Sequence, residues 1–253
     1  MQCRIYAIAQ QKGGVAKTTS TINLGVALAE RGHRVLLIDL DPQGALSVGL
    51  GAEPLQLTET IYNALRDSNF PLSRVLVTNT ECHLVPANID LSASELELVS
   101  EPGRERILRD KLTPLLNDYD YVLIDCPPSL SLLTLNALSA ASRVIIPVAT
   151  QYFALRGMEL LFQNIAKVKA RINPELEVSG ILATMFDSRT THSREVLEEL
   201  KNTYADKLFR TVIPFTVKLQ DSVMAGQSIL RFMPGSGAAQ AYRELAEEVE
   251  KRG

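Results

Sequence analysis

The feature that most constrains the fold of this chain is the alternation of short apolar runs with helical patterns. The runs contain few polar residues, so both faces of each strand are expected to be buried, as in parallel sheets. Strands that alternate with helices predict a doubly wound α/β fold, with a mostly parallel sheet flanked by helices. The predicted strands are 4–9, 34–38, 121–124, 143–148, 178–185 and 209–213, and the predicted helices are 18–31, 93–99, 104–116, 130–141, 155–172, 189–204 and 238–251.

The length of 253 residues allows one or two domains, and we expect a single domain over residues 1–253. The chain shows no repeat, no low-complexity stretch and no Pro/Gly-rich linker. Because the first predicted strand starts at Arg4, we expect no separate N-terminal DNA-reading module. A hydrophobic content of 46% and a charged content of 22% are ordinary for a globular protein. No apolar run approaches the roughly 20 residues of a membrane span.

The net charge and the cysteines indicate which partners and which cellular setting suit the protein. A formal net charge of −3 argues against a protein coated in constitutive positive charge. The three cysteines, Cys3, Cys82 and Cys126, form no CxxC pair, and no secretory signal precedes them. A reduced, cytoplasmic setting fits this pattern best.

The segment between the first strand and the first helix, residues 11–19, reads QKGGVAKTT. A strand that leads through a glycine-rich turn into a helix forms a phosphate cradle, because its backbone N–H groups and helix dipole favour anions. Lys17 then reaches the β- and γ-phosphates, and Thr18 can bind Mg²⁺. Gln11 and Ala16 stand where the strict P-loop pattern has glycines. The alternative is a glycine turn that only joins strand to helix.

Acidic residues follow two further strands. Asp39 and Asp41 follow the second strand, and Asp125 follows the strand at 121–124. The carboxyl ends of strands face the crevice where α/β proteins bind ligands, and an apolar strand that ends in Asp is a Walker B pattern. An Asx turn is the alternative for Asp41. Cys126 also permits a metal-cluster reading, but a small buried hydrophobe accounts for it better.

These motifs resemble the deviant Walker A motif of the ParA/MinD family of ATPases, in its short chromosomal ParA/Soj form. The resemblance rests on a second lysine, Lys12, before the two glycines, on residues 39–44 (DLDPQG) and on residues 123–129 (LIDCPPS). Residues 184–190 (TMFDSRT) and 210–219 (RTVIPFTVKL) extend it over nearly the whole chain. Ala16 replaces a glycine that is usual in the family.

The resemblance implies a role for each matching residue. Lys12, Lys17, Asp39 and Asp41 are the expected catalytic residues, with Lys12 reaching the nucleotide of a partner subunit and Asp41 positioning the attacking water. Metal contacts are expected from Thr18, Asp39 and Asp125, and DNA contacts from Arg189 and Lys218. The expected ATP-binding residues are Lys12, Gly13, Gly14, Val15, Ala16, Lys17, Thr18, Thr19, Met185, Pro214 and Phe215, with the last three forming the adenine pocket.

The resemblance also implies a function. It predicts an ATPase that uses ATP and Mg²⁺, forms a homodimer on ATP binding and binds nucleoid DNA without sequence preference. A ParB-like adaptor protein would stimulate hydrolysis and so partition or position a DNA or protein cargo, with the protein cytoplasmic and nucleoid-associated. Phe215 and residues 220–223 depart from the family pattern, and both departures bear on the DNA or partner contacts.

Two other functions stay open. A MinD-like membrane-associated ATPase needs a basic amphipathic C-terminal helix, whereas residues 242–251 are acidic, so no stable membrane association is expected. A metabolic P-loop enzyme would carry dedicated polar residues for its substrate or paired cysteines, and the sequence shows neither.

Overall fold

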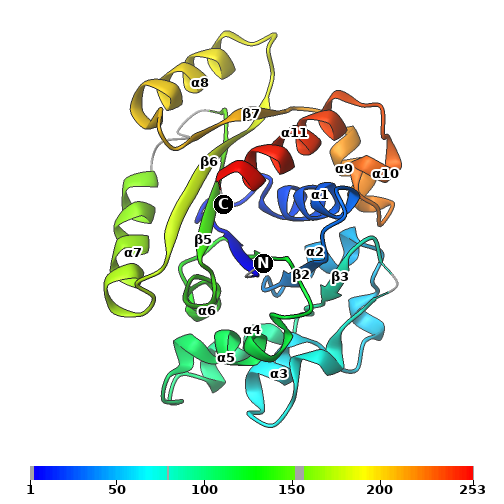
Figure 1. Ribbon diagram of the computed structural model, residues 1–253, viewed down its shortest axis with the longest axis vertical. Helices are drawn as coiled ribbons and strands as arrows, with labels where there is room; N and C mark the ends of the chain where they lie inside the picture. The colour runs from blue at the N-terminus through cyan, green and yellow to red at the C-terminus, as the bar shows by residue number, and fades with distance from the viewer. Residues whose placement is uncertain (1–2, 79, 152–156, 253) are drawn as a thin grey trace.

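A computed structural model describes residues 3–78, 80–151 and 157–252 of the chain. Its centre is a seven-stranded sheet with the order β3-β2-β4-β1-β5-β6-β7, and every pair of neighbouring strands is parallel (Figure 1). The prediction of a doubly wound parallel sheet flanked by helices is confirmed.

The elements have the following bounds. The strands are β1 (Arg4–Ile8), β2 (Val35–Asp39), β3 (His83–Val85), β4 (Tyr121–Asp125), β5 (Arg143–Ala149), β6 (Glu177–Phe186) and β7 (Leu208–Pro214). The helices are α1 (Lys17–Glu30), α2 (Ala45–Gly49), α3 (Ile61–Arg66), α4 (Leu91–Glu97), α5 (Ile107–Leu112), α6 (Leu132–Ala140), α7 (Met158–Arg171), α8 (Thr191–Tyr204), α9 (Lys218–Met224), α10 (Ile229–Phe232) and α11 (Gly237–Arg252). Short 3₁₀ turns cover Pro54–Gln56, Leu72–Val75, Arg104–Arg106 and Thr113–Leu115.

The core lies in two layers, one on each face of the sheet. Tyr6 and Ile8 of β1 pack with α1, α2, α9, α10 and α11, whereas Ile5 and Ala7 pack with α3 to α8. Side chains alternate between the faces of a strand, so apolar residues at every position of β1 supply both layers. This explains the uninterrupted apolar runs of the sequence.

The strand order also fixes where a ligand can bind. The chain leaves β1 toward β2 on one side of the sheet, and later runs outward through β5, β6 and β7 on the other side. The crevice outside the carboxyl ends of strands at such a switch point is the usual ligand site of open α/β sheets. The loop after β1 opens into this crevice.

Several elements differ from the predictions. Strand β3 and the helices α2, α3, α9 and α10 are too short to give a periodic pattern. The single helix predicted at 104–116 is a 3₁₀ turn, α5 and a second 3₁₀ turn that contains Pro114, whose ring and missing N–H interrupt helical bonding. Of the helix predicted at 155–172, residues 155 and 156 lie outside the described residues, and α7 begins at Met158.

None of the described helices combines the length and the apolar character that a membrane span requires.

Candidate nucleotide site

The loop between β1 and α1 has the backbone of a phosphate cradle. Gly14 and Ala16 both adopt left-handed conformations, with φ of 69° and 64°, and the 14-residue helix α1 begins directly after them at Lys17. This geometry turns the chain sharply, so that the N-terminus of α1 faces the crevice. Ala16 has the positive φ that makes glycine usual at this position, at a strain of about 1 kcal/mol.

The two lysines of the loop occupy different environments. Lys17 is buried, with 7% of its surface exposed, and its Nζ donates to the carbonyl oxygen of Lys12 at 3.3 Å. Burial lowers the pKa of Lys17, opposed by the charges of Asp125, Cys126 and Asp41. Lys12 is exposed, and its amine makes no hydrogen bond or ion pair with any described residue. One lysine therefore points into the loop, and the other is available to a second molecule.

A carboxylate and two hydroxyls meet at the start of α1. Thr18 Oγ1 donates to Asp125 Oδ2 at 2.6 Å, and Thr21 Oγ1 donates to Asp125 Oδ1 at 3.3 Å. Asp39 stands opposite Asp125 in the parallel register of β2 and β4, and both carboxyl groups are fully buried.

The electrostatics of this pair suit a divalent cation. Burial raises the pKa of Asp39 to about 7, and burial together with the charge of Asp39 raises the pKa of Asp125. Two buried carboxylates and the Thr18 hydroxyl form the hard oxygen donor set that Mg²⁺ prefers. The residues present therefore fit a magnesium ion.

Asp39 and Asp41 are held by their own loop. Asp39 Oδ2 accepts from the backbone N–H of Ser47 at 2.9 Å and from its Oγ at 2.7 Å, and Asp39 Oδ1 accepts from the N–H of Asp41. Asp41 Oδ1 accepts from the N–H of Gln43 at 3.0 Å, so the Asx turn considered for Asp41 is present. Asp41 also lines the cleft described next.

A cleft of about 280 Å³ opens beside the loop. Ten of the residues predicted for the site line it: Gly13, Gly14, Ala16, Lys17, Thr18, Thr19, Asp41, Met185, Pro214 and Phe215. Lys12, Val15, Asp39 and Asp125 do not line it. Val15, Asp39 and Asp125 are buried behind the cleft, while Lys12 is at the surface.

The far wall of the cleft comes from the ends of β6 and β7. Met185 has a left-handed backbone, with φ of 54°, and Phe215 leaves 48% of its surface exposed. The N–H of Phe215 donates to the carbonyl oxygen of Phe186 at 2.9 Å, which keeps the two strand ends together. An apolar wall opposite a phosphate loop suits an aromatic base.

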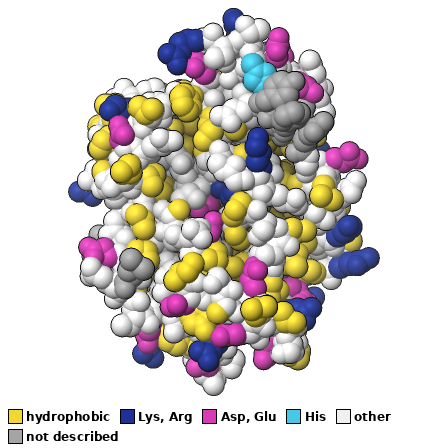
Figure 2. All heavy atoms as spheres, turned by 180° about the vertical axis from the view of Figure 1, so that it is seen from behind, with side chains coloured by type: hydrophobic (Ala, Val, Ile, Leu, Met, Phe, Trp, Pro, Cys, Tyr) yellow, Lys and Arg dark blue, Asp and Glu magenta, His cyan; other side chains and the backbone are white. Residues whose placement is uncertain are grey.

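The two residues predicted to contact DNA lie outside the cleft lining. The side chain of Arg189 is 82% exposed and donates two hydrogen bonds to the Asp187 carboxylate, while Lys218 pairs with Asp221 at 3.0 Å. Each cation is thus partly neutralised by a neighbour. On the face shown in Figure 2, the Lys and Arg side chains of the described residues are dispersed, mostly toward the rim, and form no continuous basic area.

Some contacts around the site were not predicted. Ser47, which anchors Asp39, carries no signal in the sequence. Thr21 also contacts Asp125. Because Thr21 lies four residues after Lys17, the two share one face of α1, and this spacing could have indicated that Thr21 faces the site. The cleft lining also includes Pro128, Ile213, Thr216, Leu219 and Gln220. Cys126 is fully buried, as expected of a small hydrophobe.

Comparison with known proteins identifies the family. Residues 3–178 match the model of a family described as AAA domain. The chain is 42% identical to the sporulation initiation inhibitor protein Soj of Bacillus subtilis over 251 residues, 99% of each protein. It is 44% identical to the chromosome partitioning protein ParA of Myxococcus xanthus, over 98% of this chain and 88% of that protein.

A solved structure is similar to this chain in both fold and sequence. A protein described as cobyrinic acid a,c-diamide synthase of Mycobacterium smegmatis, with bound ADP and magnesium, has a TM-score of 0.86 and 42% identity. The alignment covers 97% of this chain and 93% of that one. With its phosphate loop, its paired carboxylates and these relatives, the chain belongs to the ParA/Soj-type partitioning ATPases of the ParA/MinD deviant Walker A family, and its cofactors are ATP and Mg²⁺.

Proposed function

We propose that residues 1–253 act as a single-domain, ATP-gated DNA-binding switch. Two subunits would close around two ATP molecules, bind nucleoid DNA without sequence preference, and release it after hydrolysis. A ParB-like adaptor would accelerate hydrolysis, so that the cycle partitions or positions a DNA or protein cargo. The observation that carries the proposal is that one loop holds a buried Lys17 and an exposed Lys12 whose amine has no partner among the residues that the structure describes.

The phosphate loop supplies the binding of ATP. The N–H groups of Gly13, Gly14, Val15 and Ala16 would cradle the phosphates, and Lys17 would exchange its contact with the Lys12 carbonyl for the β- and γ-phosphate oxygens. Thr19 would bind the α-phosphate. Met185, Pro214 and Phe215 would pack on adenine.

Hydrolysis follows from the acidic residues. Thr18, Asp125 and Asp39 would hold Mg²⁺, which when bound neutralises the charge that develops on the phosphates. Asp41 would orient the attacking water, because it lines the cleft and the Asx turn holds its side chain. Lys12 of the second subunit would supply a further positive charge to stabilise the transition state. Cations supplied by a partner have this role in other P-loop enzymes.

DNA binding would depend on the dimer. Arg189 lies in the loop after β6, and Lys218 is the first residue of α9. Each is paired with an acidic neighbour, which weakens its individual contact with a DNA phosphate. Affinity for DNA grows with the number of phosphates that are neutralised. A dimer that doubles these contacts therefore binds where a monomer does not.

We place the protein in the cytoplasm, on the nucleoid. The acidic residues of α11, among them Glu244, Glu247 and Glu248, would be repelled by anionic lipid, which disfavours the MinD-like alternative.

The metabolic alternative has one observation in its favour, the name of the solved M. smegmatis relative, cobyrinic acid a,c-diamide synthase. Incubation with cobyrinic acid, ATP and a nitrogen donor tests it. Formation of the a,c-diamide at a rate that matches ATP consumption would replace the partitioning function.

The proposed function is tested by DNA retardation with ATP, with ADP and without nucleotide, in the presence of Mg²⁺. The expected result is retention with ATP alone, together with dimerisation in sedimentation. A parallel pelleting assay uses phosphatidylglycerol-containing liposomes. ATP-dependent pelleting with liposomes but no retention of DNA would establish the MinD-like alternative.

A further inference from the structure

A buried pair of hydroxyls lies behind the apolar wall of the cleft. Thr150 follows the end of β5 and is fully buried, and Ser193 lies in the first turn of α8 and is nearly so. Their oxygens are 3.4 Å apart, and Ser193 Oγ donates to the carbonyl oxygen of Thr150 at 3.0 Å. Neither residue lines the cleft, and the proposed function assigns neither a role.

The hydroxyl of Thr150 faces the strained residue of the wall. Thr150 Oγ1 lies 3.3 Å from the carbonyl oxygens of both Thr184 and Met185. In a regular strand successive carbonyls point to opposite sides, so the left-handed φ of Met185 is what brings both to one donor. A left-handed conformation in a bulky residue persists only where its surroundings hold it.

The same cluster is tied to the rest of the site. The N–H of Ser193 donates to Thr190 Oγ1 at the N-cap of α8, which fixes the position of the Ser193 hydroxyl. Thr184 Oγ1 donates to the carbonyl oxygen of Val15 in the phosphate loop at 3.1 Å. The wall at Met185 is therefore held at a defined distance from the loop.

We propose that Thr150 and Ser193 are positioning residues for the nucleotide base. The Thr150 hydroxyl, itself positioned by Ser193, holds Met185 in its left-handed conformation. It thereby sets the wall that packs on the base at the spacing a nucleotide requires. This inference rests on the proposed placement of the base against Met185.

The test compares a ligand that has a base with one that lacks it. Dissociation constants for Mg·ATP and for Mg·tripolyphosphate are measured on the full chain by calorimetry. Thr150→Val keeps the shape but removes the hydroxyl, and it should weaken ATP binding on the order of tenfold while changing tripolyphosphate binding by less than about twofold. Thr150→Ser retains the hydroxyl and should restore ATP affinity.

Two results would overturn the inference: unchanged ATP affinity in Thr150→Val, or equal losses for both ligands. If Thr150→Val does not fold, Ser193→Ala carries the same comparison with the same expected outcome. A double-mutant cycle adds a second criterion. Met185→Gly removes the Met185 side chain from the wall and accepts the left-handed backbone without support, so adding Thr150→Val to it should cause no further loss. Additive losses would contradict the inference.

The variant Lys17→Ala tests the proposed phosphate site independently of the positioning role of Thr150. It should lose both ligands, because it removes the main cation of the phosphate loop. Near-normal ATP affinity in Lys17→Ala would refute the phosphate site. A base-selective loss in Thr150→Val would still support the positioning role.

Discussion

At the scale of single residues, the site is built from groups held in unfavourable states. Ala16 and Met185 have left-handed backbones, and two carboxylates are buried side by side. Each state costs free energy in the unliganded protein. Phosphates and a divalent cation would stabilise these states, so backbone strain and buried carboxyl groups concentrate where ATP and Mg²⁺ are expected to bind.

The role of Asp41 can be tested by Asp41→Ala. Loss of the carboxylate should leave ATP binding intact and lower hydrolysis on the order of 100-fold, because the attacking water is no longer oriented. The ATP-bound dimer should therefore accumulate, as measured by sedimentation and phosphate release. Gln43→Ala is a suitable control, since only its backbone N–H contacts Asp41. A variant that remains monomeric with ATP would contradict this role.

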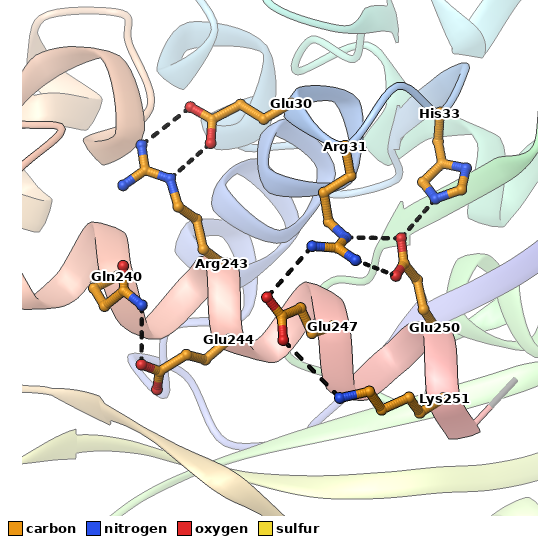
Figure 3. Close-up of polar contacts among 9 residues, drawn as sticks. All are labelled: Glu30, Arg31, His33, Gln240, Arg243, Glu244, Glu247, Glu250 and Lys251. Atoms are coloured by element: carbon orange, nitrogen blue, oxygen red, sulfur yellow. Dashed lines mark hydrogen bonds and ion pairs between the residues drawn. The ribbon is translucent and has the colours of Figure 1, made fainter.

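At the scale of elements, an ion-pair network joins the first and the last helix. Arg31, directly after α1, and His33 both contact Glu250 of α11, and Arg243 of α11 pairs with Glu30 (Figure 3). Because α1 begins at the phosphate loop, the network fixes the helix that carries Lys17 against the layer formed by α11.

The network predicts a pH dependence of stability. The hydrogen bond from Arg31, with that from His33, holds the pKa of Glu250 at about 2, below its unfolded value of about 4.3. A lowered folded pKa means that this stabilisation is present above the unfolded pKa and is lost as the pH falls toward 2.

Glu250→Gln should therefore lower the free energy of unfolding at pH 7 by up to about 1 kcal/mol, the range for partly exposed pairs. The difference from wild type should shrink at pH 3, in urea unfolding at both pH values. Glu244→Gln on the same helix is the matched control, since its carboxylate contacts only Gln240 among the described residues. A difference of equal size at both pH values would contradict the assignment to Glu250.

The loop after β6 and the start of α9 carry the predicted DNA contacts. Arg189→Glu combined with Lys218→Glu should abolish ATP-dependent DNA retention and leave dimerisation unchanged, because neither side chain lines the nucleotide cleft. Arg171→Glu with Lys251→Glu changes the charge equally at the C-terminal ends of α7 and α11. This control should retain DNA. Retention by the first variant would move the DNA-binding surface elsewhere.

At the scale of the whole molecule, the net charge of −3 restricts how DNA can be bound. On the face shown in Figure 2 the basic side chains are dispersed, and Arg189 and Lys218 are each paired with an acid, so each of these two makes only a weak phosphate contact in a monomer. The total charge therefore argues against strong unconditional binding, while it permits binding that depends on pooling the contacts of two subunits.

This restriction predicts a steep salt dependence. The logarithm of the DNA association constant of the ATP-bound dimer should fall linearly with the logarithm of salt concentration. The slope reports the number of phosphates neutralised, at about 0.9 per phosphate for duplex DNA. Titration by fluorescence anisotropy at several salt concentrations measures it. A salt-independent affinity would contradict binding through phosphate contacts.

The sequence by itself determined the class of fold and the chemistry of the nucleotide site. Uninterrupted apolar strands predicted the parallel sheet, because burial on both faces leaves no polar positions. The phosphate loop could be predicted because its lysine, glycines and threonine are contiguous, so local order alone places them at a helix N-terminus. The short β3 and the helices α2, α3, α9 and α10 could not be predicted, since they are too short for periodicity to emerge.

Only the tertiary structure decided which side chains support the site. Thr18 meets Asp125 across 107 positions of sequence, and Thr184 meets Val15 across 169. Ser47 holds Asp39, Thr150 contacts Met185, and Ser193 contacts Thr150, without any motif to indicate these contacts. These contacts depend on the order of the strands and on how the helices pack, which no local pattern encodes. The residue types in the motifs determine the chemistry of the site, whereas the packing of strands and helices determines which other side chains support it.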